Sequence, residues 1–359
     1  MNEFAQKLLS KLPEGSAYVS FRPENRRYLT GITSSNGMVL ICEEKQIFYT
    51  DFRYITMANN DIRPGYGVQM LQKSFAATLS EDLPESVKTV YFEDEFLTYR
   101  EFRALSDALS DRFELIGDEK VLSDLRMIKS PEEIEKIVTA QSFTDRAFAH
   151  ICDFIAMHWK KGDLTEQRIA TEIEYAMKCA GADKPSFDTI VAAGENGSKP
   201  HAVPSSRIIR KGDMITMDFG SVYDGYCSDM TRTVAVGEVT DHQREIYEIV
   251  LAAQMNALNH LKAGMTGIEI DALARDLISE KGYGSEFGHS LGHGVGLMIH
   301  EAPNFSIRSE GIIPAYSVMS VEPGIYLPDD CGVRIEDLVV VLDGGCRNIT
   351  ASPKELLIL

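Results

Sequence analysis

Two segments of this sequence that start 101 residues apart follow the same pattern. In the first, Thr165 precedes a helical pattern of apolar residues that ends at Gly181, and in the second, Thr266 and Gly282 enclose a similar pattern. Threonine is a common N-cap of a helix and glycine often follows its last turn, so each segment predicts one capped helix. The repeat indicates that the chain from about residue 130 onward forms two related α/β halves. The seam between such halves is a natural place for a ligand.

Composition excludes several classes of protein. With 359 residues the chain can bury a sizeable core, and its length suggests two domains. The formal net charge of -18 argues against a nucleic-acid-binding or membrane-binding role. We find neither a membrane-length apolar run nor a secretory signal pattern, and therefore expect a cytoplasmic protein. The six cysteines form no CxxC pair, which indicates reduced thiols rather than a zinc ribbon or a disulfide scaffold.

The first 120 residues alternate between strand-like and helix-like runs. This alternation predicts an α/β domain with a mixed sheet. We find no phosphate loop or dinucleotide fingerprint in it and assign it no chemistry. The expected strands are Ala17–Phe21, Met38–Cys42, Ile47–Thr50, Val68–Leu71 and Val87–Phe92, and the expected helices include Phe75–Leu83 and Arg100–Asp111.

A capping box marks the beginning of the second domain. Ser130 is followed by Pro131 at the first helical position and by Glu133 three residues later. A long helical pattern follows this signal. We therefore expect two domains, residues 1–124 and residues 125–359.

Two strand-like runs each carry an aspartate. A turn signal at residues 222–225 connects the two runs. If these four residues form the loop, Ser221 pairs with Tyr226, and the same register places Asp218 opposite Asp229. Directly opposed Cβ atoms lie roughly 4.5–5.5 Å apart, and like charges so placed destabilise a hairpin unless a cation lies between them. Because the neighbouring side chains are apolar, the pair predicts a metal site better than a solvated surface.

A second pair of carboxylates follows in the C-terminal part of the chain. A hairpin centred near Asp329 would place Glu322 opposite Glu336, each within an apolar strand. A buried carboxylate without a partner is costly. Either Arg334 therefore pairs with one of the glutamates or a metal binds both.

A histidine-rich and glycine-rich stretch, Phe287–Glu301, holds three of the eight histidines within twelve positions. Such a run packs poorly as a core strand, and it suits either a metal with substrate beside it or a loop with incidental histidines. Four carboxylates and one histidine form a suitable two-metal set, which favours manganese, or cobalt in vitro, over a zinc cage. His201 and His300 could then donate hydrogen bonds to a developing oxyanion.

The segment His289–Glu301 resembles the signature of the proline-specific branch of the pita-bread metallopeptidases, aminopeptidase P and prolidase, with methionine aminopeptidase more distant. The ligand order Asp, Asp, His, Glu, Glu is complete, and the resemblance covers essentially the whole chain. It implies an α/β (α+β) fold. A creatinase-like N-terminal α/β domain would precede a pita-bread catalytic domain with pseudo-twofold duplicated halves.

The resemblance also implies the site and its cofactor, two divalent metal ions per subunit, with Mn2+ favoured and Co2+ or Zn2+ as alternatives. In this family pattern a hydroxide that bridges the metals attacks the scissile carbonyl. Asp229 and Glu336 would bridge the metals, and Glu322 would also carry the proton to the leaving nitrogen. The implied metal ligands are Asp218, Asp229, His293, Glu322 and Glu336.

The remaining roles follow from the same resemblance. His201 and His300 would be catalytic, orienting the substrate and stabilising the tetrahedral intermediate. His289 and Arg334 would lie at the substrate, His289 near the proline pocket. Tyr326 would form a network with Arg334 and the bridging carboxylate of Asp229.

The function implied is an Xaa-Pro aminopeptidase acting on peptides with proline at the second position, and a homodimer is expected. The alternative is an Xaa-Pro dipeptidase. Prolidases of similar size often carry an arginine where this chain has Asn304, and the next arginine is Arg308, which favours the aminopeptidase. A metal-free hydrolase like creatinase and a non-catalytic peptide-binding scaffold are further alternatives, against which the complete ligand set argues.

Overall fold

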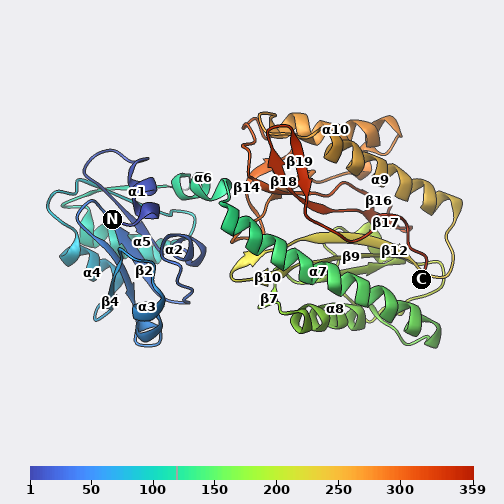
Figure 1. Cartoon of the computed structure of the whole chain (residues 1–359), viewed down its shortest axis with the longest axis horizontal. Coiled ribbons are helices and arrows are strands. Elements are labelled where there is room, and N and C mark those ends of the chain that lie inside the picture. Colours follow the sequence, from blue (N-terminus) through green and yellow to red (C-terminus); the bar gives the residue numbers. More distant parts are fainter. Residues whose placement is uncertain (119) are drawn as a thin grey trace. The chain divides into compact units, whose positions relative to one another are not determined.

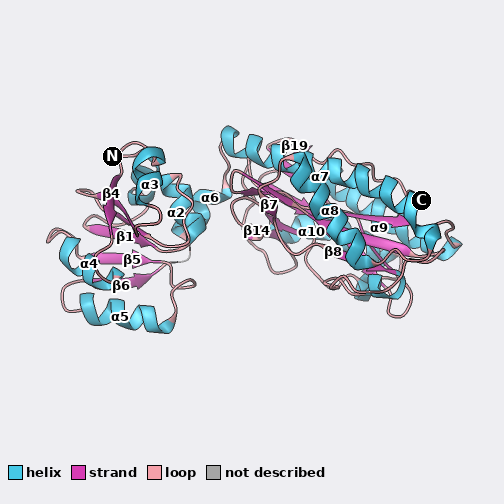
Figure 2. Ribbon diagram, turned by 90° about the horizontal axis from the view of Figure 1, so that it is seen from below, coloured by secondary structure: helices cyan, strands magenta, loops and turns pink. Residues whose placement is uncertain are grey.

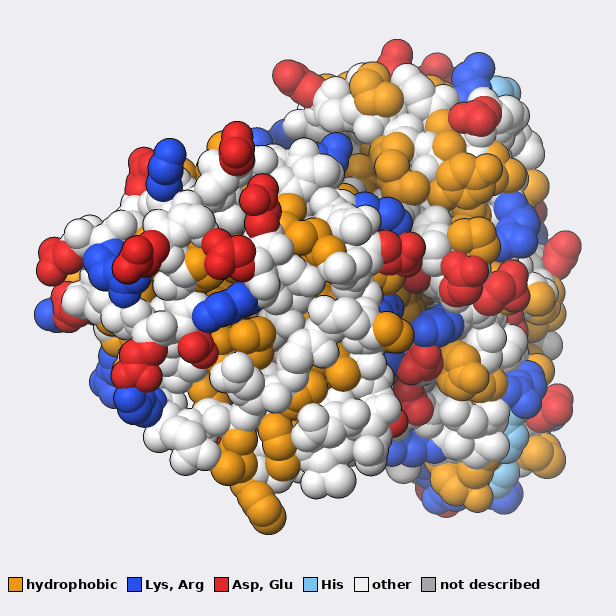
Figure 3. Space-filling model, turned by 60° about the vertical axis from the view of Figure 1, so that its left-hand side comes forward, with side chains coloured by type: hydrophobic (Ala, Val, Ile, Leu, Met, Phe, Trp, Pro, Cys, Tyr) orange, Lys and Arg blue, Asp and Glu red, His pale blue; other side chains and the backbone are white. Residues whose placement is uncertain are grey.

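The computed structural model describes residues 1–118 and 120–359 (Figure 1). The chain divides into two compact units, Met1–Arg126 and Met127–Leu359. Acidic and basic side chains are interspersed on the face drawn in Figure 3. Within the described residues, no helix combines the length and the apolar character that crossing a bilayer requires.

A six-stranded sheet forms the N-terminal unit (Figure 2). Its elements are α1 (Glu3–Leu9), β1 (Ser16–Ser20), α2 (Pro23–Thr30), β2 (Met38–Ile41), β3 (Gln46–Thr50), α3 (Ile55–Asp61), β4 (Gly67–Met70), α4 (Phe75–Asp82), β5 (Thr89–Phe92), α5 (Tyr99–Leu109), β6 (Glu114–Gly117) and α6 (Val121–Met127). The strand order is β4-β3-β2-β1-β5-β6, with β2 antiparallel to both neighbours and the other pairs parallel. Leu79 of α4 and Leu105 of α5 belong to the core beside the sheet. The expected mixed α/β sheet is thus confirmed, and β6 is a strand that the sequence did not predict.

The C-terminal unit consists of two halves, each with a helix pair and its own strands. The first half holds α7 (Pro131–His158), η1 (Trp159–Lys161), α8 (Glu166–Ala180), β7 (Lys184–Pro185), β8 (Ile190–Ala193), η2 (Gly194–Ser198), β9 (Met214–Phe219), β10 (Ser221–Tyr223), β11 (Tyr226–Cys227) and β12 (Met230–Ala235). The second holds α9 (Asp241–His260), α10 (Gly267–Glu280), η3 (Gly284–Glu286), β13 (Gly292–Gly294), β14 (Glu301–Phe305), β15 (Val318–Val321), β16 (Gly324–Tyr326), β17 (Gly332–Arg334), β18 (Asp337–Leu342) and β19 (Gly345–Asn348). Figure 1 shows α9 and α10 (orange) at one end of this unit and α8 (green) at the other, with β9, β12, β16 and β17 between them.

Each half buries its helices against its own strands. In the first half, α7 and α8 share a core with the sheet β12-β9-β8, in which Ile155 and Ile173 lie with Met217. In the second half, α9 and α10 share a core with the sheet β14-β13-β15-β18-β19, in which Val250 lies with Val339. Two smaller sheets, β11-β10-β7 and β16-β17, complete the unit.

The duplication predicted from the sequence is present in the hydrogen bonds. Thr165 and Thr266 each cap their helix, and each forms an isolated antiparallel bridge, to Ile208 and Ile312 respectively. In each half, the residue after the bridged isoleucine donates a backbone hydrogen bond to the carbonyl of the residue before the threonine. The expected pseudo-twofold halves are therefore confirmed. The capping box at Ser130 is also formed.

The first carboxylate hairpin has a different register from the predicted one. Asp224 and Gly225 both have positive φ, 44° and 78°, and form a two-residue turn, so Tyr223 pairs with Tyr226. Asp218 consequently pairs with Thr231, and the predicted pairing of Asp218 with Asp229 is wrong by two residues. An Asp-Gly pair favours this tight turn because both central residues need positive φ. Since side chains alternate with period two, a shift of two residues keeps each aspartate on its predicted face.

The second carboxylate hairpin has the predicted register. Gly324 pairs with Arg334 on one side, and Val321 pairs with Asp337 on the other. Counting from either ladder, Glu322 lies opposite Glu336, as expected. The glutamates lie in the gap between the two ladders, where their side chains face the site.

Candidate metal centre

The predicted site residues from both halves meet at one cavity of about 390 Å³. Asp218 of β9 and Asp229 before β12 come from the first half, and His293 of β13 comes from the second. Nine of the ten predicted residues line the cavity: Asp218, Asp229, His293, Glu322, Glu336, His201, His289, His300 and Arg334. The tenth, Tyr326, reaches the site through hydrogen bonds to two of them.

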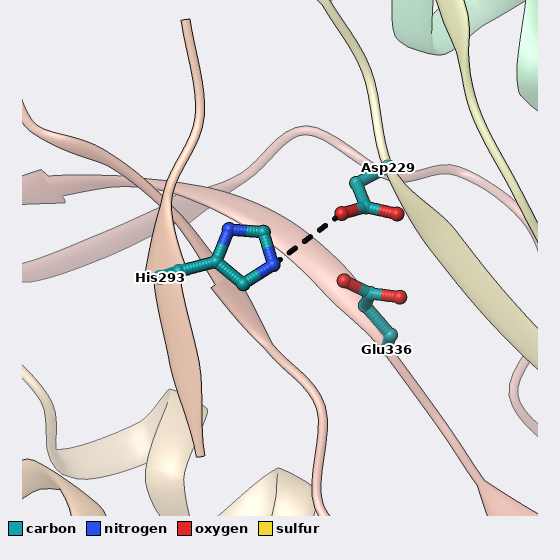
Figure 4. A group of neighbouring side chains, drawn as sticks. All are labelled: Asp229, His293 and Glu336. Carbon is teal, nitrogen blue, oxygen red and sulfur yellow. Dashed lines mark ion pairs between the residues drawn. The ribbon is translucent and has the colours of Figure 1, made fainter. Parts of the chain in front are cut away.

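Three of the side chains form the centre of the cluster (Figure 4). Asp229, His293 and Glu336 each offer one ligand atom, and these atoms all lie within 4.8 Å of one another. Nε2 of His293 lies 3.6 Å from Oδ2 of Asp229 and 3.2 Å from Oε1 of Glu322. Side chains from separate segments of the chain thus converge on a volume that one or two cations could occupy.

The electrostatics of the cluster fit a cation. Burial, followed by the charges of nearby carboxylates, raises the pKa of both Asp229 and Glu336 well above its usual range. In the described part of the chain, Oδ1 of Asp218 and Oε1 of Glu336 are buried side-chain oxygens without a hydrogen-bond partner. Buried polar atoms normally have partners, so two orphaned oxygens facing one cavity indicate a missing ligand. A divalent metal would satisfy both atoms and would offset the clustered negative charge.

Arg334 binds a different aspartate from the expected one. Its guanidinium donates to Oδ2 of Asp218 at 2.6 Å, to the Tyr326 hydroxyl at 2.8 Å and to Oγ1 of Thr231 at 3.0 Å. The network of Arg334 and Tyr326 was expected to include Asp229 instead. Because Arg334 pairs with an aspartate and not with a glutamate, Glu322 and Glu336 would be available to a metal.

The three site histidines outside the metal cluster differ in their anchoring. Nε2 of His289 is hydrogen-bonded to the Tyr326 hydroxyl at 2.8 Å. The ring of His300 packs edge-on against His293, with centroids 4.4 Å apart. Burial, then the charge of His293, lowers the pKa of His300. A neutral imidazole at position 300 can donate one hydrogen bond to substrate. His201 lies on an exposed loop after η2.

Sequence reasoning missed two hydroxyls that hold the ligands. Ser320 donates to Oε1 of Glu322 at 3.0 Å, and its oxygen accepts from the backbone N–H of His293. Thr231 donates to Oε2 of Glu336 at 2.8 Å. Ser320 of β15 and Thr231 of β12 each lie two residues from a ligand candidate just beyond the end of the strand, so period-two alternation was a usable signal. The cavity is also lined by Phe187, Asp188, Ile190, Pro200, Ser290 and Ile299, which carried no motif.

The residues considered for binding a substrate carboxylate lie outside the cavity lining. Asn304 of β14 pairs with His293 across the strands, and its side chain is exposed. Arg308 is also exposed. Among the described residues that line the cavity, the one arginine is Arg334, which already contacts Asp218.

Two family models match the chain. The model of metallopeptidase family M24 matches residues 135–343, and the creatinase/prolidase N-terminal domain matches residues 6–128. The M24 match contains every residue proposed above for the metal site and covers more than half of the chain.

Similar proteins match along almost their whole length. The chain is 36% identical to an Xaa-Pro dipeptidase of Pyrococcus furiosus over 372 residues, covering 99% of this chain and 100% of that protein. Among solved structures, an Xaa-Pro dipeptidase from Bacillus anthracis is 41% identical with a TM-score of 0.94, and 99% of each chain is covered. An X-Pro aminopeptidase from Thermotoga maritima is 37% identical with a TM-score of 0.89, covering 98% of this chain and 100% of that one.

Proposed function

We propose that this chain, which belongs to metallopeptidase family M24, is a peptidase that hydrolyses Xaa-Pro dipeptides at a dinuclear metal site. The observation that carries the proposal is the convergence of Asp218, Asp229, His293, Glu322 and Glu336 on one cavity with orphaned buried oxygens. The dipeptide preference departs from the aminopeptidase interpretation of the sequence. The similar Xaa-Pro dipeptidases support this alternative better.

The five converging residues would hold the metal. Their oxygen-rich donor set with one imidazole favours manganese among the divalent metals, and four carboxylates are enough to hold two ions. Bound metal would supply Lewis acidity and would lower the pKa of water to near neutrality. Asp229 and Glu336, which come from different halves, would both contribute carboxylate oxygens to holding the metal.

Glu322 would be the residue that moves a proton. Burial raises the pKa of this carboxyl, but its hydrogen bond to His293 and the charge of that residue lower it, and the balance holds the pKa at about 2. Glu322 is therefore ionised at neutral pH in the metal-free site, and its carboxylate lines the cavity, where it could accept a proton from the attacking water. It can then pass the proton to the leaving nitrogen, which is a secondary amine when the leaving residue is proline.

His201 and His300 would stabilise the substrate's carbonyl oxygen as negative charge develops. Hydrogen-bond donors fixed in a partly dehydrated cavity are more effective than water at this task. An Xaa-Pro bond has no N–H, so the proline must be recognised by its ring. Phe187, Ile190 and Ile299 offer apolar surface in the same cavity for that ring.

A second candidate function, cleavage of longer Xaa-Pro peptides, has one structural observation in its favour. A dipeptide presents its carboxylate next to the proline ring, whereas a longer peptide does not. Arg308 and Asn304 lie outside the cavity lining, and Arg334 is paired with Asp218. The similarity to the X-Pro aminopeptidase of Thermotoga maritima also supports this candidate.

The deciding experiment compares Ala-Pro, Ala-Pro-Ala and Ala-Ala as substrates. The protein is stripped of metal, loaded with manganese, and assayed for kcat/KM on each peptide. Cleavage of Ala-Pro in preference to the other two supports the dipeptidase, and preference for the tripeptide supports the second candidate. Equal cleavage of Ala-Ala would refute proline specificity, and full activity without metal would refute the metal site.

A further inference from the structure

We propose that Glu166 is a positioning residue that clamps the His201 loop, residues 194–205, against the cavity and thereby sets where the His201 ring meets substrate. This inference rests on the proposed function, because His201 acts on a substrate only if the cavity is the peptidase site. Glu166 is not itself part of the cavity lining.

The clamp is one buried carboxylate that joins both ends of the loop. Glu166 is the first residue of α8 and has no exposed surface. Its Oε1 accepts from the backbone N–H of Ala193 at 2.8 Å and from Nδ2 of Asn196 at 3.0 Å. Its Oε2 accepts from the backbone N–H of Ser205 at 3.0 Å and from the hydroxyl of Ser205 at 2.6 Å. Both ends of the loop are therefore hydrogen-bonded to the same side chain.

The His201 ring depends on this backbone for its position. Across residues 1–118 and 120–359, its side chain has no hydrogen-bond partner. His201 lies within a turn in which the N–H of Ala202 donates to the carbonyl of Lys199, and Nη1 of Arg334 donates to the preceding carbonyl of Pro200 at 3.4 Å. A small displacement of the loop ends would therefore move the ring relative to the substrate carbonyl.

The other half of the C-terminal unit shows that the fold does not need this carboxylate. Gly267 is the first residue of α10 and occupies the position equivalent to Glu166. A Cβ at Gly267 would lie 2.2 Å from the carbonyl oxygen of Asn304. The same threonine cap and the same bridge form around both residues. The carboxylate therefore serves the loop of its own half and not the helix start common to both.

The chemistry of the clamp suggests a conservative variant. Both carboxylate oxygens of Glu166 accept hydrogen bonds. Glu166→Gln keeps the shape of the side chain but replaces one oxygen by an NH2 group, which faces hydrogen-bond donors and cannot accept from them. A residue that acts through another gives non-additive effects when both are changed. The clamp can therefore be tested by a cycle of Glu166→Gln, His201→Ala and the double variant.

The cycle is measured on an Xaa-Pro peptide that the wild-type enzyme cleaves. Because a misplacement of about 1 Å can cost about 100-fold, we expect Glu166→Gln to lower kcat by about 10- to 100-fold with little change in KM. The double variant is expected to be no slower than His201→Ala alone. If the two reductions multiply in the double variant, the proposal is overturned.

Asp145 provides a matched control. Its carboxylate accepts from the backbone N–H of Ser352 at 2.8 Å and from the hydroxyl of Ser352 at 2.6 Å, as Glu166 does at Ser205. Ser352 does not line the cavity. Any reduction of kcat caused by Asp145→Asn is therefore expected to multiply with the reduction caused by His201→Ala.

Amide hydrogen exchange gives a readout independent of turnover. In Glu166→Gln, exchange is expected to accelerate at Ala193 and Ser205 and through the loop between them, while β12 keeps its protection. Unchanged exchange in the loop would overturn the proposal. If Glu166→Gln does not fold, Ser205→Ala removes one of the four donors and tests the same coupling to His201. A wild-type enzyme inactive on Xaa-Pro peptides would refute the proposed function, whereas the exchange result tests the clamp alone.

Discussion

Arg334 and Asp218 form an asymmetric ion pair. The guanidinium donates to one oxygen of Asp218 at 2.6 Å, and the other oxygen has no hydrogen-bond partner among the described residues. The two residues come from different halves, on β17 and β9. The pair thereby fixes the orientation of the carboxylate and leaves one oxygen directed toward the cavity.

Arg334→Lys is expected to weaken metal binding and to lower kcat. A lysine keeps the charge but cannot reproduce the three separate contacts to Asp218, Tyr326 and Thr231. Loss of such support behind a metal ligand commonly costs about 10- to 100-fold in affinity or activity. Titration of the metal-free variant with Mn2+ measures the affinity. An affinity equal to that of the wild type would contradict the role assigned to Arg334.

Metal is expected to stabilise the protein more at about pH 8 than at about pH 5. Burial and neighbouring charges raise the pKa of Asp229 and Glu336, so the metal-free native state binds more protons than the unfolded chain. The free energy of unfolding without metal therefore falls as pH rises from about 4, the ordinary carboxyl pKa, through the raised values. Metal binds the deprotonated carboxylates and removes this loss.

Thermal unfolding with and without Mn2+ over that pH range measures the effect. The difference in Tm between the two forms should widen as pH rises. A difference in Tm that is constant, or that is larger at acid pH, would show that protonation of these carboxyls does not compete with metal binding.

Lys129→Met is expected to destabilise the C-terminal unit by about 3 kcal/mol. Nζ of Lys129 lies 2.8 Å from Oε1 of Glu301, and both side chains are buried, at 1% and 6% exposure. Removing one charge of a buried pair typically costs about 3–5 kcal/mol, because the other charge stays in a poorly solvating environment. Glu301 directly follows His300, so kcat should fall as well.

Urea unfolding of Lys129→Met, Glu301→Gln and the double variant measures the pair. The double variant should lose less stability than the sum of the two single variants. The exposed pair Lys211 and Glu238, 2.7 Å apart, serves as a control whose removal should cost less than about 1 kcal/mol. Equal costs for the two pairs would contradict the prediction.

Asn304→Arg is expected to raise kcat/KM for Ala-Pro relative to Ala-Pro-Ala. Asn304 pairs with His293 across β13 and β14, so a long cationic side chain at position 304 starts one strand away from a metal ligand. An arginine can bind a carboxylate through two parallel hydrogen bonds. Asn304→Gln, which lengthens the side chain without adding a charge, is the control. An unchanged ratio in the arginine variant would show that position 304 lies beyond the reach of the substrate carboxylate.

A strand register could be predicted from the sequence where a single turn determines it. The register linking Glu322 to Glu336 was predicted correctly because a turn centred on Asp329 determines it. The register predicted for Asp218 was wrong because the sequence of residues 222–225 is compatible with both a four-residue loop and a two-residue Asp-Gly turn. Despite that error both aspartates lie on the predicted face, since a shift of two residues does not change the face of a strand.

By itself, the sequence determined the two-domain α/β fold, the repeated halves and the set of carboxylates and histidines that a metal site requires. These features follow from caps, periodicity and turn residues, which act over a few neighbours. Only the tertiary structure decided that Arg334 binds Asp218 and that Glu166 holds both ends of the His201 loop. Those contacts join residues from separate elements, and the packing of whole helices and sheets determines which buried donor meets which acceptor.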